Sequence, residues 1–135
     1  MQIHESAENY LETILVLRRE KGAVRSIDIA NEMGFSKPSV SVAMKNLREN
    51  GYIETDGDGF ITLTDSGLNI AEKIFERHTL LTNWLVALGV PEETADCDAC
   101  RIEHVISAES FEAIKKHAIE YFEKICLYFS LAKIA

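Results

Sequence analysis

The sequence lacks any uninterrupted apolar run near the roughly 20 residues that a membrane-spanning helix requires, although 47% of its 135 residues are hydrophobic. Its first residues, Met1 to Glu5, also lack the basic start and apolar stretch of a secretion signal. We therefore expect a cytoplasmic protein that is not associated with a membrane. The length suits one compact core or a small two-part domain.

Cysteine is scarce, and the three that occur, Cys97, Cys100 and Cys126, are an odd number that favours thiols over a disulfide framework. Cys97 and Cys100 form a C-x-x-C pair, which occurs in thiol oxidoreductases and in halves of zinc knots. No thioredoxin-like βαβ pattern surrounds the pair, and no second C-x-x-C exists. A thiol redox or zinc protein is therefore the weaker alternative, and we expect no enzyme.

Basic residues are outnumbered by acidic ones, and the chain has a net charge of −8. This net charge by itself argues against nucleic-acid binding, which needs a basic surface. The charges are unevenly distributed, however. Residues 18–52 carry seven Lys or Arg against four acids, a net charge of +3, whereas residues 53–135 carry seven against fifteen. A locally basic segment on an acidic protein suits specific DNA binding with little non-specific background.

The basic segment contains the pattern of a helix followed by a helix-turn-helix. The expected helices are residues 6–20, residues 27–33 and a third that ends at Asn50-Gly51. A serine that can cap the first turn lies at or just before the start of each of them: Ser6, Ser26 and Ser36. Residues expected to face the core in the second and third helices are Ile27, Ile29, Ala30, Met33, Val40, Met44 and Leu47.

Two short alternating runs follow, Tyr52 to Thr55 and Phe60 to Leu63, joined by Asp56-Gly57-Asp58-Gly59. This pattern predicts a β-hairpin, which would be the wing of a winged helix-turn-helix. In such a fold the second helix of the helix-turn-helix enters the DNA major groove. The alternative is a helix pair and hairpin that do not touch DNA. The residues that we expect to contact DNA are Arg25, Lys37, Pro38, Ser39, Ser41, Val42, Lys45 and Asn46.

The rest of the chain is expected to be all helical. A long apolar stripe after Asp65-Ser66-Gly67 includes Leu88 and ends at Gly89. Further helices are expected from about Pro91 to Ile106 and from Ser110 onward, followed by an apolar tail, Leu127 to Leu131, that should dock on the body or on a partner. We predict a mainly α protein with a DNA-binding domain at residues 1–70 and a helical metal-binding and dimerisation domain at residues 71–135.

A thiol, a carboxylate and an imidazole recur at i, i+3 and i+4 in Cys100, Glu103 and His104. On a helix these spacings place the three side chains on one face, where they can converge on one divalent cation. The pattern therefore predicts half of a metal site.

Three segments resemble, in order, the motifs of the diphtheria toxin repressor and manganese transport regulator family: Ser6 to Glu12, Arg77 to Leu81, and Asp98 to Ser107. The family implies metal-activated transcriptional repressors with an N-terminal winged helix and a helical dimerisation domain. The resemblance is to the short, manganese-type architecture without an SH3-like third domain. Carried over by position, it implies the metal ligands Asn9, Glu12, His78, Cys100, Glu103 and His104.

Two of these positions depart from the manganese-type pattern, which has acids in place of Asn9 and Cys100. The ancillary site of iron-type members is doubtful too, because Thr82 and Asp96 replace its Glu and His. A thiolate is a softer ligand than a carboxylate, so we favour Fe²⁺ as the effector with Mn²⁺ next. Co²⁺, Ni²⁺ and Zn²⁺ should bind in vitro by the general affinity order.

The hypothesis for the mechanism is that metal joins the first helix, with Asn9 and Glu12, to the ligands of the helical half. A homodimer fixed in this way would present two recognition helices to a pseudo-palindromic operator in double-stranded DNA. The competing hypothesis from another class is a winged-helix regulator that senses an organic ligand in its helical half.

Overall fold

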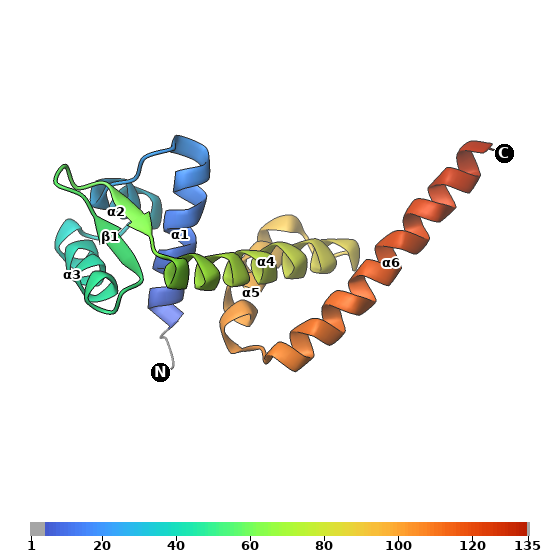
Figure 1. Ribbon diagram of the computed structural model, residues 1–135. Coiled ribbons are helices and arrows are strands. Elements are labelled where there is room, and N and C mark those ends of the chain that lie inside the picture. The colour runs from blue at the N-terminus through green and yellow to red at the C-terminus, as the bar shows by residue number, and fades with distance from the viewer. Residues whose placement is uncertain (1–4, 135) are drawn as a thin grey trace. The chain divides into compact units, whose positions relative to one another are not determined.

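The computed structural model describes the backbone of residues 5–134 and the side chains of residues 5–124. Within this part of the chain it has six helices and two strands (Figure 1). They are α1 (Glu5–Lys21), α2 (Ser26–Met33), α3 (Lys37–Glu49), β1 (Ile53–Thr55), β2 (Ile61–Leu63), α4 (Asp65–Ala87), α5 (Glu92–Val105) and α6 (Ala108–Ile134). The predicted mainly helical class with one hairpin is confirmed.

The chain divides into two compact units, Met1–Phe75 and Glu76–Ala135. We call them the winged-helix unit and the helical unit. Helix α4 contributes its first half to the former and its second half to the latter.

The core of the winged-helix unit joins α1, the helix-turn-helix, the hairpin and the start of α4. Leu11 and Ile14 of α1 are completely buried, as is Ile29 of α2. On α3 the three residues predicted to face inward, Val40, Met44 and Leu47, are buried as well. Burial at i, i+4 and i+7 leaves the opposite side of α3 in solvent.

The turn between α2 and α3 has the predicted chemistry. Gly34 takes the left-handed conformation at φ 69°, and its N–H donates to the carbonyl of Ala30. The Ser36 hydroxyl then caps α3 by accepting the N–H of Ser39 at 3.3 Å. Together these caps fix the sharp change of direction that a helix-turn-helix requires.

Two details of α2 were predicted wrongly. Ser26 does not cap the helix but is its first residue, since the carboxylate of Asp28 accepts the N–H of Arg25 at 2.9 Å. Ile27, expected in the core, is 39% exposed. A carboxylate in the first turn is a stronger acceptor than a hydroxyl, so it moved the helix start one residue earlier.

The wing is a two-stranded antiparallel hairpin in which Glu54 pairs with Thr62. Its turn is held by Asp56, whose carboxylate accepts the N–H groups of Asp58 and Phe60, both at 2.9 Å. The N–H of Ile61 also donates to the carbonyl of Val24 at 2.7 Å, which ties the wing to the helix-turn-helix.

Asp65, Ser66 and Gly67 were expected to precede the helix, but α4 begins at Asp65 and includes them. The Thr64 hydroxyl caps this earlier start by accepting the N–H of Gly67 at 3.2 Å. Gly67 is packed against Tyr52. A Cβ atom added at Gly67 would lie 2.0 Å from the Tyr52 carbonyl oxygen. This close approach makes glycine necessary at the start of α4.

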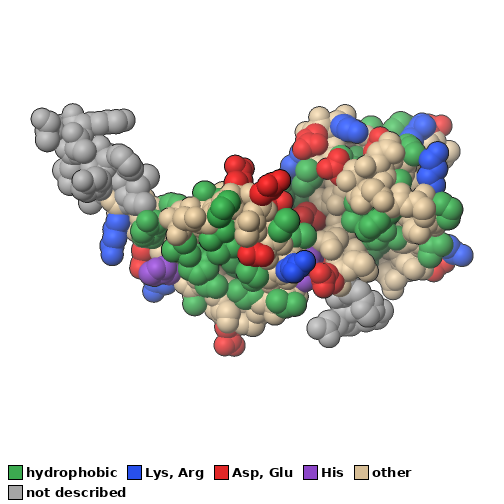
Figure 2. Space-filling view, turned by 180° about the vertical axis from the view of Figure 1, so that it is seen from behind, with side chains coloured by type: hydrophobic (Ala, Val, Ile, Leu, Met, Phe, Trp, Pro, Cys, Tyr) green, Lys and Arg blue, Asp and Glu red, His purple; other side chains and the backbone are tan. Residues whose placement is uncertain are grey.

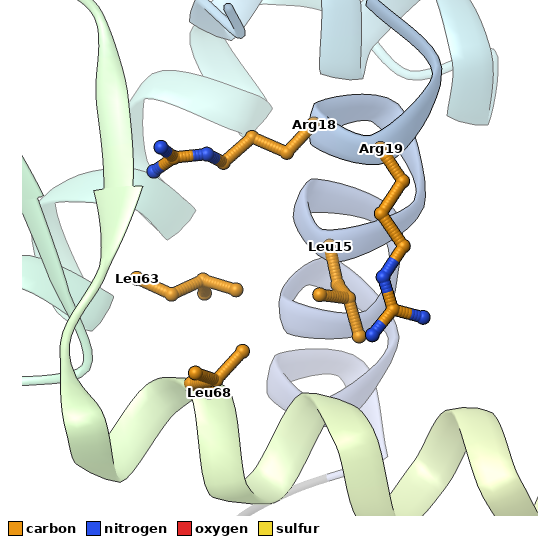
Figure 3. Close-up of a pocket in the computed structure, with 5 residues that line it drawn as sticks. All are labelled: Leu15, Arg18, Arg19, Leu63 and Leu68. Carbon is orange, nitrogen blue, oxygen red and sulfur yellow. The ribbon is translucent and has the colours of Figure 1, made fainter. Parts of the chain in front are cut away.

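A shallow hollow of about 330 Å³ lies where α1, β2 and α4 meet in the winged-helix unit (Figure 3). Leucines form its walls and two arginines its rim: Leu15, Leu63, Leu68, Arg18 and Arg19. Arg19 lies 3.9 Å from Glu72 and over the ring of Phe75. The hollow is formed by side chains that stabilise the junction of these elements.

The helical unit packs α4, α5 and α6 around Leu81, Ala99 and Phe111. Helix α6 starts at Ala108, not at Ser110, because the Ser107 hydroxyl accepts the N–H of Ser110 at 3.1 Å. Leu88, expected on the inward stripe of α4, is 61% exposed. The apolar tail Leu127 to Leu131 lies outside the residues whose side chains are described. None of the helices, over the residues described, is long and apolar enough to cross a membrane.

Candidate metal centre

The last turns of α5 bring together the three side chains predicted to form half of a metal site. Each side chain offers one ligand atom, and these atoms of Cys100, Glu103 and His104 all lie within 4.8 Å of one another. The i, i+3, i+4 spacing on α5 produces this convergence, because those positions share one helix face. Thiolate, carboxylate and imidazole are all ligands of divalent first-row metals, so the donor set fits such an ion.

Glu103 is the centre of this cluster and is completely buried. One carboxylate oxygen lies 2.8 Å from Nδ1 of His78, and the other lies 3.3 Å from Nε2 of His104. A carboxylate taken out of water is costly unless it faces positive charge or hydrogen-bond donors. The burial of Glu103 among imidazoles is therefore the arrangement expected of a cation ligand.

His78 comes from α4 and meets the cluster from the neighbouring helix. Its second ring nitrogen, Nε2, lies 2.8 Å from the carboxylate of Asp96 on α5. From the sequence, Asp96 is expected only to replace a ligand of the ancillary site. The sequence does contain a signal for the role of Asp96. This residue lies at i, i+4, i+7 and i+8 spacing with Cys100, Glu103 and His104, which places all four on one helix face.

Arg77 fixes the turn that carries these ligands. It is 7% exposed, and its guanidinium donates to the backbone carbonyls of Glu103 and Ile106, each at 3.0 Å. The same guanidinium lies over the ring of Phe111. A cation at the C-terminus of a helix satisfies its last carbonyl groups and the negative end of its dipole. Arg77 thus orients α5.

A second ion pair joins α4 to α6 in the same unit. The amino group of Lys115 is hydrogen-bonded to the carboxylate of Glu76. This bond and the charge of Glu76 raise the pKa of Lys115 above its ordinary value. The pair is exposed, so it is expected to contribute little stability.

The other residues in the predicted ligand set are placed on separate elements. Asn9 and Glu12 lie three positions apart on α1, in the winged-helix unit. Their participation in one site with the helical unit stays a prediction. Cys97 is an exposed thiol one turn before Cys100, and no disulfide joins the two.

The residues predicted to contact DNA all lie on the exposed surface of the winged-helix unit. They are Arg25 at the start of α2 and Lys37, Pro38, Ser39, Ser41, Val42, Lys45 and Asn46 on α3. Val42 is 61% exposed despite its apolar side chain. Arg25 also stacks on Phe60 of the wing, with the guanidinium 4.3 Å from the ring centroid.

The winged helix exposes the second helix of its helix-turn-helix, and the helical unit clusters thiol, carboxylate and imidazole donors. This combination defines a class of DNA-binding proteins with a metal site. Two family models match the chain, and together they span most of it. The iron dependent repressor N-terminal DNA binding domain matches residues 2–60, and the iron dependent repressor metal binding and dimerisation domain matches residues 64–124. The chain therefore belongs to the iron-dependent repressor family, as its resemblance implied.

Two curated relatives are named as transcriptional regulators. The transcriptional regulator MntR of Escherichia coli O157:H7 is 37% identical over 111 residues, which are 82% of this chain and 72% of that protein. The HTH-type transcriptional regulator MntR of Bacillus subtilis (strain 168) is 34% identical over 119 residues, which are 88% of this chain and 83% of the relative.

Solved structures show the same fold. A manganese-dependent transcriptional repressor in complex with manganese matches with a TM-score of 0.75 and 29% identity, over 83% of this chain and 52% of the other. The IdeR of T. acidophilum matches with a TM-score of 0.67 and 28% identity, over 91% and 55% of the two chains. The chain thus spans about half the length of these structures.

Proposed function

We propose that this protein is a metal-dependent transcriptional repressor in which a divalent cation is the co-repressor for genes of metal uptake. The observation that carries the proposal is the buried Glu103 carboxylate between the imidazoles of His78 and His104, beside the thiol of Cys100. Residues that would hold the ion are Asn9, Glu12, His78, Cys100, Glu103 and His104. The bound ion would supply the positive charge that these donors share.

Exposed apolar side chains support a homodimer. Five lie on the described part of the helical unit, namely Val86, Leu88, Val105, Ile119 and Tyr121. Figure 2 shows that apolar side chains gather on this unit. Contiguous exposed apolar surface commonly marks a protein interface, and the family model that matches residues 64–124 describes a dimerisation domain. Two copies of α3 would then face two half-sites of a pseudo-palindromic operator.

The switch follows from the placement of the donors. Helix α1 carries Asn9 and Glu12 and leads directly into the helix-turn-helix, whereas the remaining donors belong to the helical unit. Donors shared between the units would favour the DNA-competent arrangement of the two winged-helix units. A coupling of about 1–3 kcal/mol suffices for a 5- to 150-fold change in operator affinity.

The test begins with DNA selected from a random-sequence pool by the Mn²⁺-loaded protein. Fluorescence anisotropy then measures the affinity for the selected duplex with Mn²⁺, with Fe²⁺ under anaerobic conditions, and with excess EDTA. We expect tight binding only with metal. Equal affinity after chelation would contradict the proposal, and so would purified protein without stoichiometric metal, which would favour an organic effector.

We further propose that Fe²⁺ is the preferred effector and Mn²⁺ the next. The thiol of Cys100 is a softer ligand than the carboxylate at this position of manganese-type members. Relatives named for manganese make Mn²⁺ the alternative. The preference is therefore expected to depend on this one side chain.

Replacing Cys100 by Glu is expected to shift the metal response toward Mn²⁺, because it exchanges a soft thiolate for a hard carboxylate. Anaerobic DNA-binding titrations with Fe²⁺, Mn²⁺ and Zn²⁺ measure the shift. Cys97→Ser is the matched control, since it removes an exposed thiol one turn away. If Cys100→Glu left the order of metals unchanged, Cys100 would not determine selectivity, and if Cys97→Ser weakened metal binding, Cys97 would be a further ligand.

Replacing Lys37 by Ala is expected to weaken binding to all DNA sequences alike, because an exposed lysine in the first turn of α3 contacts phosphate rather than bases. The slope of log affinity against log salt concentration should become shallower by about 0.9, the effect of one phosphate contact. Lys73→Ala, which removes an exposed lysine from α4, should leave the slope unchanged. A loss confined to one operator sequence would instead assign Lys37 to base recognition.

A further inference from the structure

The imidazole of His78 lies between two carboxylates, and each of its ring nitrogens faces one of them. Nδ1 is 2.8 Å from Glu103, and Nε2 is 2.8 Å from Asp96. A neutral imidazole carries one proton, so it donates through one nitrogen and presents a lone pair at the other. An imidazolium could donate to both carboxylates, but an imidazole that binds a metal is neutral. At its nitrogen without the proton, two lone pairs would face each other at 2.8 Å unless a cation lies beside them.

The surroundings decide which nitrogen has the lone pair. The Glu103 carboxylate is completely buried and belongs to the donor cluster with Cys100 and His104, where a cation is expected. The Asp96 carboxylate is 62% exposed and lies on the opposite edge of the ring. The lone pair of His78 is therefore needed at Nδ1, and the proton at Nε2.

We propose that Asp96 is a positioning residue for the metal site. It accepts a hydrogen bond from the Nε2–H of His78, holds the proton on that nitrogen, and so directs Nδ1 toward the ion beside Glu103. The inference rests on the proposed function, since it concerns how the same site is organised. A carboxylate behind a metal-binding imidazole fixes its orientation and raises its basicity, and loss of such a partner weakens metal binding about 10- to 100-fold.

Asp96 also lines a hollow of about 480 Å³ with Thr82, Glu92 and Glu93. These acids supply the matched control, because Glu93→Gln removes one negative charge from the same hollow, three positions from Asp96 on the same helix. Two variants of Asp96 separate its roles. Asp96→Ala removes the acceptor, whereas Asp96→Asn retains an oxygen that can accept the same hydrogen bond.

Competition with a fluorescent chelator measures the Mn²⁺ affinity of each variant. We expect Asp96→Ala to bind about 10- to 100-fold more weakly, Asp96→Asn to recover most of the loss, and Glu93→Gln to resemble the parent because an exposed charge is screened. Equal affinities for Asp96→Ala and Glu93→Gln would overturn the proposal. So would one fewer bound ion in Asp96→Ala, which would make Asp96 a ligand.

Nuclear magnetic resonance of the ring nitrogens gives a second readout that a purely structural role would not change. In the Zn²⁺-loaded parent we expect the His78 proton on Nε2, and a proton on Nδ1 would contradict the inference. Glu103→Gln separates the two proposals. If this variant still binds metal, the proposed metal site fails. If it loses metal while Asp96→Ala behaves like Glu93→Gln, only the positioning role fails.

Discussion

Replacing Glu103 by Gln is expected to abolish metal-dependent DNA binding. The substitution keeps the volume of a completely buried side chain but removes the negative charge that faces His78 and His104. Because loss of an outer partner alone weakens metal binding about 10- to 100-fold, loss of a central ligand should exceed 100-fold. Anisotropy with the selected operator measures the effect.

A thermodynamic measurement distinguishes this loss from misfolding. An ion at 100 times its dissociation constant stabilises the parent by about 2.7 kcal/mol. Denaturant unfolding with and without Mn²⁺ should show that stabilisation in the parent and not in Glu103→Gln. Asp98→Asn is the control, because it removes an exposed acid from the same helix. Metal stabilisation that survived in Glu103→Gln would remove Glu103 from the site.

Replacing Gly67 by Ala is expected to destabilise the winged-helix unit by about 1–3 kcal/mol, the usual cost of overpacking a well-packed site. Alanine normally favours a helix over glycine by about 1 kcal/mol, but here its Cβ would lie 2.0 Å from the Tyr52 carbonyl oxygen. That oxygen also accepts the N–H of Thr64 at 3.0 Å. Moving it aside would therefore break the hydrogen bond that leads the chain from the wing into α4.

Circular dichroism during urea unfolding in EDTA measures the effect on the whole chain, and hydrogen exchange of the Leu11 and Ile14 amides reports on the winged-helix core. Gly57→Ala is the control, since nothing lies within 4 Å of a Cβ at this turn position. Equal stability of Gly67→Ala and the parent would show that the approach to Tyr52 relaxes without cost.

Local chemistry explains which parts of the fold were predictable. Gly34 and Ser36 mark the helix-turn-helix correctly because each acts on residues three or four positions away. Ser26 was wrong as an N-cap and Ser110 was wrong as a helix start for the same local reason. A competing acceptor lay close by, the Asp28 carboxylate in one case and the Ser107 hydroxyl in the other.

The candidate site was predictable only where it lies on one helix. The i, i+3, i+4 spacing predicts that Cys100, Glu103 and His104 converge. The pairing of His78 with Asp96 was not predictable in this way, because it joins residues 18 positions apart on two helices. Arg77 was missed for a related reason. Its partners are backbone carbonyls on α5, and backbone acceptors leave no trace in residue types.

The contacts of Arg77 bear on which substitutions the end of α5 can accept over evolutionary time. Its guanidinium binds main-chain atoms of the α5 turn, and those atoms are the same whichever side chains the turn displays. If Cys100 is a ligand as proposed, a substitution there would exchange one donor for another while these contacts of the α5 turn stay in place. On that proposal, single replacements would alter the metal preference without altering the winged helix.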